Sequence, residues 1–253
     1  NSDNAVAQYK ELLDKYPNSP EADDALDNLK TIYVEQGRTS EYVDIARKAG
    51  KPVSVNTEDS LTFTSAMIKY EAGNLVAALD AFNNYLQRFS NGEHTTEVHY
   101  YRAEIYNARK DWNNALSSYA VVAERAPNTF AERAILNAAR ISFFELKTYA
   151  EAEKYYAQLK QVTAGQETKM EAMRGLLRSQ YQMQKWNEAE ANAKELVTLK
   201  GSSTDDKALA NMAIAKAYQV KSQYDLAIAN YKSVVALNKA ALSAEARYEI
   251  ANS

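Results

Sequence analysis

Residues 112–122 read WNNALSSYAVV, and 37 positions later residues 149–159 read YAEAEKYYAQL. In both stretches an alanine (Ala115, Ala152) stands three residues after an aromatic residue and four residues before a tyrosine. The alanine recurs at Ala5, Ala78, Ala189 and Ala227, and Tyr42 fills the one missing position. Successive steps are 37, 36, 37, 37, 37 and 38 residues. A fixed period between about 20 and 50 residues is typical of a repeat solenoid.

Three further columns keep register with the alanine. Trp112, Ala115, Tyr119 and Val122 stand at i, i+3, i+7 and i+10, which is one face of an α-helix. We expect a second helix to cross closely at the alanine, with the flanking aromatic residues filling the space around it. The columns are Leu75, Trp112, Tyr149, Trp186 and Tyr224 before the alanine, then Tyr9, Phe82, Tyr119, Tyr156 and Tyr231, then Leu12, Tyr85, Val122, Leu159, Leu196 and Val234.

Each alanine is expected on the second helix of a two-helix unit. The prolines and six of the seven glycines lie between predicted helices, and Ser19 before Pro20 predicts a helix start. Thr129 and Thr148, each followed by a glutamate three residues later, predict capping boxes. The sequence thus predicts an all-α, right-handed α-solenoid of about fourteen helices. Its units cover 1–17 (partial), 20–54, 57–91, 93–127, 129–164, 166–201, 203–239 and 242–253 (partial), with the longest loop from Gly50 to Thr57.

The aromatic–Ala–aromatic spacing resembles the tetratricopeptide repeat (TPR) family over nearly the whole chain. We call the recurring alanine, or Tyr42 in its place, the column residue. The resemblance is extended by a glycine five residues before the column residue, at Gly37 and Gly73, and by a proline twelve residues after it, at Pro17 and Pro127. The period of about 37 exceeds the 34 usual in the family. Long units with phrases such as Tyr16-Pro17-Asn18 look similar to bacterial cell-envelope members, of the outer-membrane-assembly lipoprotein and Tol–Pal-associated periplasmic types.

Two positions depart from the simple pattern. The family has a small residue twelve positions before the alanine, where this chain has Arg140 in one unit. A one-residue register shift, which would place Ala139 in the small slot, is preferred here to a buried ion pair. Gly175 falls inside a predicted helix, where it predicts close helix packing.

Composition excludes several classes of function. The chain of 253 residues has 30 Lys and Arg, 33 Asp and Glu and no cysteine. It therefore lacks the basic excess of a nucleic-acid binder, any disulfide and any thiolate metal site. The two histidines, His94 and His99, are five apart and not at the i, i+4 spacing of a zinc helix. No metal, no cofactor, no membrane insertion and no enzymatic activity is expected.

Function is expected on the surface. In the TPR family the first helices line a concave groove that receives a peptide or a helix. Carried over by register, the resemblance implies a partner-binding set of Phe63, Met67, Tyr70, Tyr100, Glu104, Asn107, Asn137, Phe144, Arg174, Arg178 and Tyr181. We expect this lining to be acidic in its first half and more basic around Arg174, Arg178 and Lys216.

The sequence thus favours a non-catalytic protein-interaction scaffold. Because both ends look cut, we expect a fragment of a longer protein from the bacterial periplasm or cell envelope, although a cytoplasmic location is not excluded. The alternatives are a regulatory arm of an enzyme or sensor whose active domain lies elsewhere, or a spacer.

The alanine column gives the first testable prediction. Ala115→Leu and Ala152→Leu should each lower the free energy of unfolding by roughly 1–3 kcal/mol, because extra volume at a close helix crossing is overpacked. The same change at Ala108, expected on the groove side, should cost much less. Urea unfolding measures all three, and equal losses would show that the helix faces are wrongly assigned.

Overall fold

The computed structural model describes residues 2–237 and 240–252, and throughout them every regular element is a helix. Two compact units are formed by Asn1–Asp111 and Trp112–Ser253. The first contains α1 (Ser2–Lys15), α2 (Pro20–Gln36), α3 (Thr39–Lys48), α4 (Val55–Glu71), α5 (Leu75–Arg88) and α6 (Thr95–Ala108). The second contains α7 (Trp112–Glu124), α8 (Ala131–Arg140), the π-helical turn η1 (Ile141–Glu145), α9 (Tyr149–Val162), α10 (Gln166–Gln182), α11 (Trp186–Thr198), α12 (Thr204–Val220), α13 (Tyr224–Ala236) and α14 (Ala240–Asn252).

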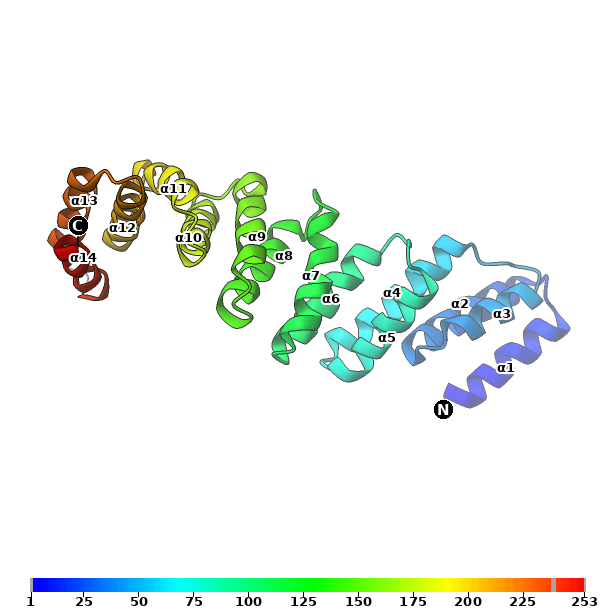
Figure 1. Cartoon of the computed structure of the whole chain (residues 1–253). Helices are drawn as coiled ribbons and strands as arrows, with labels where there is room; N and C mark the ends of the chain where they lie inside the picture. Colours follow the sequence, from blue (N-terminus) through cyan, green and yellow to red (C-terminus); the bar gives the residue numbers. More distant parts are fainter. Residues whose placement is uncertain (1, 238–239, 253) are drawn as a thin grey trace. The chain divides into compact units, whose positions relative to one another are not determined.

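Within each unit a helix packs against its neighbours in the chain (Figure 1). In the second unit, α10 also contacts α12, and α12 contacts α14, so consecutive first helices lie side by side. The predicted all-α fold with fourteen α-helices is confirmed over the described residues. The π-helical turn was not predicted.

The alanine column forms the core of this packing. Ala78, Ala115, Ala152, Ala189 and Ala227 have no exposed surface, and Tyr42 is buried in their place. The tyrosines Tyr119, Tyr156 and Tyr231, four residues after an alanine, are buried beside them. Of the column alanines, only Ala5, on α1, is partly exposed. The buried face of the second helices, assigned from the sequence, is therefore confirmed.

Gly175 marks a close approach between repeats. It lies in α10, and a Cβ added there would overlap the ring of Tyr156 on α9. The predicted close packing is confirmed. Glycine costs about 1 kcal/mol relative to alanine inside a helix, so the fold accepts this cost to admit the buried tyrosine.

The glycine column is a backbone requirement of the repeat. The residue five positions before the column residue has a left-handed backbone, with φ between 57° and 77°, in all six units: Gly37, Gly73, Lys110, Lys147, Gln184 and Ser222. At Ser222 the amide donates to Gln219 O at 2.9 Å and the next amide donates to Tyr218 O at 2.9 Å. This is a Schellman turn, which satisfies the last carbonyls of the helix.

Helix starts were predicted less well. Ser19 caps α2 as predicted, accepting from Ala22 N at 3.2 Å. The side chain of Thr148 makes no capping hydrogen bond, and the N-cap residue of α8 is Phe130 instead of Thr129. Both predicted capping boxes are therefore wrong. The loop from Gly50 is shorter than predicted because Ser54 caps α4, accepting from Thr57 N at 3.1 Å.

The left-handed turns give a test by substitution. Ser222→Gly should raise the free energy of unfolding by about 0.5–1 kcal/mol, because a non-glycine residue in this conformation costs about 1–2 kcal/mol and glycine's extra freedom in the unfolded chain offsets part of it. Gly73→Ala should lower stability by a similar amount. An added Cβ there meets no atom within 4 Å, so the loss would come only from the left-handed backbone conformation, which alanine disfavours.

Ser117→Gly is the matched control, an exposed serine inside α7. It should lower stability by roughly 0.5 kcal/mol through helix propensity alone. Urea midpoints compare the three variants. If Ser222→Gly lowers stability as Ser117→Gly does, the left-handed turn is not a constraint on the repeat.

Candidate functional site

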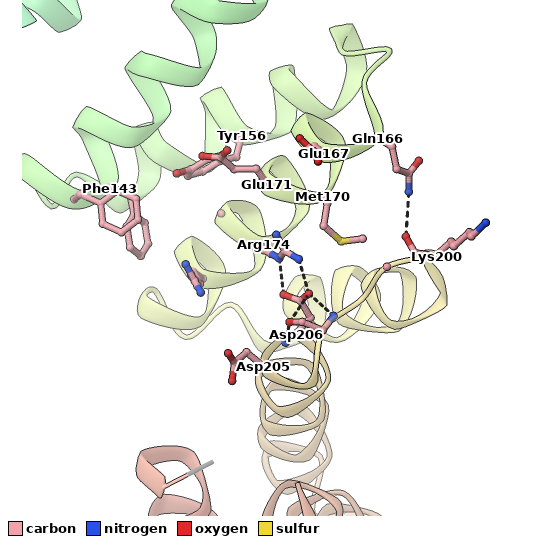
Figure 2. A pocket seen from close by; sticks show the side chains of 15 residues that line it. Phe143, Tyr156, Gln166, Glu167, Met170, Glu171, Arg174, Lys200, Asp205 and Asp206 are labelled. Atoms are coloured by element: carbon pink, nitrogen blue, oxygen red, sulfur yellow. Dashed lines mark hydrogen bonds and ion pairs between the residues drawn. The ribbon is translucent and has the colours of Figure 1, made fainter. Parts of the chain in front are cut away.

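A cavity of about 790 Å³ lies within the second unit. It is bounded by η1, α9, α10, the loop before α12 and the start of α12 (Figure 2). Three members of the predicted partner-binding set line it: Phe144, Arg174 and Arg178. The other lining residues are Phe143, Tyr156, Gln166, Glu167, Met170, Glu171, Gly175, Lys200, Gly201, Ser203, Asp205 and Asp206. We call this cavity the unit 2 pocket.

The π-helical turn shapes one wall of the unit 2 pocket. Leu146 N donates to Ile141 O at 3.0 Å, a bond one residue longer than that of an α-helix. The extra residue shifts the register, so Ala139 is buried and Arg140 is exposed. The predicted register shift is therefore confirmed, and the π turn is its cause. Within the turn, Phe144 is 47% exposed, with its ring centroid 4.9 Å from that of Phe143.

Ion pairs hold much of the pocket's charge in place. Arg174 donates from Nε and Nη2 to the two carboxylate oxygens of Asp206, at 2.6 and 2.7 Å (Figure 2). Burial alone would raise the pKa of Asp206, but the Arg174 guanidinium and hydrogen bonds from Ser203 hold it below its usual value. The same carboxylate closes a capping box with Ser203 at the start of α12. The pair therefore fixes the start of α12 against α10.

The expected basic half of the lining is largely neutralised. Arg174 is paired with Asp206, and Lys216 donates to Glu249 at 2.7 Å. Arg178 is exposed and, in the part of the chain that the structure describes, has no carboxylate at ion-pair distance. Of the three predicted cations, Arg178 is thus the one whose charge faces solvent.

Two other predicted residues make structural contacts. Asn137 donates to the hydroxyl of Tyr119 at 3.0 Å, and Tyr181 donates to Glu245 at 2.8 Å. Burial, reinforced by Glu245, raises the pKa of Tyr181 above its usual value. Neither residue lines the unit 2 pocket. Whether they contact a partner stays a prediction.

A smaller cavity of about 310 Å³ lies in the first unit, between α4 and α6. It is lined by Phe63, Thr64, Met67, Ile68, Glu71, Glu97 and Tyr101, and we call it the unit 1 pocket. Phe63 and Met67 belong to the predicted set. Tyr70 does not line the pocket but contacts the lining residue Tyr101, with ring centroids 5.0 Å apart. Glu104 and Asn107 are partly buried outside it, and Tyr100 is only 6% exposed, so its ring offers little surface.

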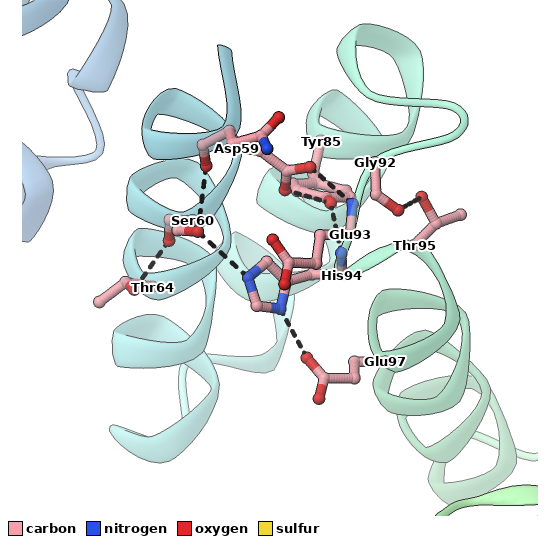
Figure 3. Close-up of polar contacts among 10 residues, drawn as sticks. Asp59, Ser60, Thr64, Tyr85, Gly92, Glu93, His94, Thr95 and Glu97 are labelled. Atoms are coloured by element: carbon pink, nitrogen blue, oxygen red, sulfur yellow. Dashed lines mark hydrogen bonds and ion pairs between the residues drawn. The ribbon is translucent and has the colours of Figure 1, made fainter. Parts of the chain in front are cut away.

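A buried polar network borders the unit 1 pocket, and it was not predicted. The Asp59 carboxylate accepts from the Tyr85 hydroxyl and, at 2.8 Å, from Glu93 N, while Tyr85 Oη accepts from His94 N at 3.1 Å (Figure 3). Burial, and then the bond to Asp59, raise the pKa of Tyr85 well above its usual value. Gly92 is required here, because a Cβ would meet Asp59 and Tyr85.

Neither cavity contains a group of side chains that could form a metal site. Among the residues that the structure describes, no three His, Asp or Glu side chains are grouped to hold an ion. His94 instead stacks on Phe63, with centroids 4.3 Å apart and an interplanar angle of 3°, and its Nδ1 lies 2.8 Å from Glu97 Oε2. Across the same described ranges, no helix is both long and apolar enough to span a bilayer.

Comparison with known proteins identifies the repeat. Residues 1–19 and 97–129 match the model of a tetratricopeptide repeat family. The solved structure of YrrB, described as a TPR protein with an unusual peptide-binding site, is 13% identical over 74% of this chain and 91% of its own, with a TM-score of 0.52. A tetratricopeptide repeat protein from Parabacteroides merdae is 20% identical over 96% of this chain and 90% of its own, with a TM-score of 0.36. None of the curated protein sequences matches.

Two segments of the chain, residues 1–19 and 97–129, therefore match the tetratricopeptide repeat. The family model matches two of the segments that carry the alanine column, around Ala5 and Ala115. The resemblance drawn from the residue columns is confirmed at the level of the repeat.

Proposed function

We propose that this protein is a non-catalytic protein-interaction scaffold that binds a peptide or helix of a partner protein at the first helices of its repeats. The observation that supports this most directly is the unit 2 pocket, which combines a volume of about 790 Å³ with an exposed aromatic ring and an exposed arginine. Ligand sites are typically concave and apolar, with a few polar groups that orient the ligand.

The contacts assign a role to each part of the pocket. Phe144 offers an exposed ring backed by Phe143, which suits an apolar anchor of the partner. Arg178 offers a charge that no carboxylate of the described chain takes up, which suits a carboxylate or a backbone carbonyl of the partner. Arg174 and Asp206 are paired and serve to hold the wall in position.

The description of YrrB as a peptide-binding TPR protein agrees with this proposal, although the likeness extends only to the fold. We place the protein in the bacterial cell envelope on the resemblance of its long repeats to envelope members. Fractionation of cells that express the full-length protein from its own gene tests this placement. Recovery in the envelope or periplasmic fraction supports it, and recovery only in the cytoplasmic fraction contradicts it.

Selection from a random peptide library on the immobilised protein tests the binding function. We expect selected peptides to bind Phe144→Ala/Arg178→Ala at least about tenfold more weakly than wild type, or about 1.4 kcal/mol, as measured by fluorescence anisotropy. Tyr248→Ala is the matched control, because it removes an aromatic ring that is 67% exposed on α14, outside the pocket.

Tyr248→Ala should bind as wild type does. The proposal fails if no peptide is enriched over an empty surface. The placement at the unit 2 pocket fails if the double variant binds every selected peptide with unchanged affinity.

A further inference from the structure

One pair of a carboxylate and a cation joins each two consecutive first helices of the second unit. Arg140 on α8 pairs with Glu171 on α10, Arg174 on α10 with Asp206 on α12, and Lys216 on α12 with Glu249 on α14. The partners stand 31, 32 and 33 residues apart in the sequence. The repeat geometry therefore brings one cation and one carboxylate together at each step.

The step from α4 to α6 has the carboxylate without the cation. Glu97 stands 18 residues before Ala115, as Glu171 stands 18 before Ala189, so the two glutamates occupy the same place in their repeats. The place of Arg140, once the extra residue of the π turn is discounted, is taken by Met67. Met67 and Glu97 both line the unit 1 pocket. A methionine cannot close the pair that the second unit closes with arginine.

A second carboxylate adds to the charge of this pocket. Glu71 is exposed on its rim, and neither Lys nor Arg is among the lining residues. In the described residues, Glu97 Oε2 lies 2.8 Å from His94 Nδ1, and Glu71 has no ion pair. Burial, and then the carboxylates of Glu97 and Glu71, raise the pKa of Tyr101. Both charges therefore act at the same ring.

Other charged groups nearby are turned elsewhere. Lys69, on the same helix as Glu71, places its Nζ beside Gly37 at the turn between α2 and α3. Arg102, next to Tyr101, donates to Asn83 at 3.2 Å and lies over the ring of Tyr106. Neither cation lines the pocket.

The walls of the pocket suit the stem of a long side chain. Phe63, Met67 and Ile68 supply apolar surface along α4. Tyr101 is held by stacking on Phe82, with centroids 6.2 Å apart and an interplanar angle of 12°. Lysine and arginine bury their methylene stems on apolar surface while the charged head stays with its counter-charge, and aromatic faces attract cations.

We propose that the unit 1 pocket receives a lysine or arginine side chain of the partner peptide, which completes with Glu97 and Glu71 the ion pair that Met67 leaves unmade. The inference rests on the proposed function, because the cation belongs to a bound partner. It adds a second recognition site with its own chemistry, within the first unit and separate from Phe144 and Arg178.

Two variants test the charge requirement. Peptides selected on wild type should be enriched in lysine and arginine, and peptides selected on Glu71→Gln/Glu97→Gln should lose that enrichment. The strongest basic peptide should bind this double variant about tenfold more weakly, and the difference should shrink when its lysine or arginine is replaced by norleucine. Met67→Arg should weaken the same peptide to a similar extent, because the new arginine pairs with Glu97 as Arg140 pairs with Glu171.

Glu35→Gln/Asp80→Asn is the matched control, since both side chains are exposed carboxylates of the first unit outside the pocket. It should leave affinity unchanged. The inference is overturned if the pocket and control variants weaken binding equally, or if wild type selects no basic residues. Peptides that respond to Phe144→Ala/Arg178→Ala but not to Glu71→Gln/Glu97→Gln would overturn this inference and leave the proposed function intact. A library that yields no binder would overturn both.

Discussion

The structure depends on one contact, made where an aromatic side chain of a second helix lies between its own first helix and that of the next repeat. Phe82 on α5 has its ring centroid 6.2 Å from those of both Tyr70 on α4 and Tyr101 on α6. Tyr156 on α9 occupies the corresponding place so tightly that α10 has only a glycine beneath it. The alanine four residues earlier lets the helices approach closely enough for this insertion. This contact accounts for the constant repeat period, because each ring can insert only if the next first helix begins a fixed number of residues later in the chain.

This stacking places the polar groups that a partner would meet. Because consecutive first helices repeat in register, a side chain on one helix faces a residue 31 to 33 positions further along the chain on the next, and charges at those positions either pair or stay exposed. The second unit closes its pairs through Arg140, Arg174 and Lys216. Met67 interrupts that pattern in the first unit. The residues that we propose for recognition are therefore small departures within a regular scaffold, as the exposed Phe144 in the π turn also illustrates.

Features that recur in every repeat could be predicted from the sequence, and features of a single repeat mostly could not. The buried alanines, the inserted tyrosines, Gly175 and the shifted slot at Ala139 all follow from the columns. The π turn is visible beforehand only as the misplaced Arg140, because hydrogen bonding within one turn leaves no other mark on the columns. The sequence showed Arg174 and Lys216 as charges but not their partners, which lie 32 and 33 residues away and depend on rotamers. The contact between Asp59 and Tyr85 was missed for the same reason.

The insertion of the aromatic ring is tested most directly by a double-mutant cycle at Gly175 and Tyr156. Inside a helix, Gly→Ala should by itself raise stability by about 1 kcal/mol. Because the ring occupies the space of the new Cβ, we predict that Gly175→Ala instead lowers the free energy of unfolding by about 1–3 kcal/mol. In a Tyr156→Leu background the same change should become neutral or stabilising, which reveals the coupling between the two sites. An equal loss in both backgrounds, or a gain in wild type, would contradict the account.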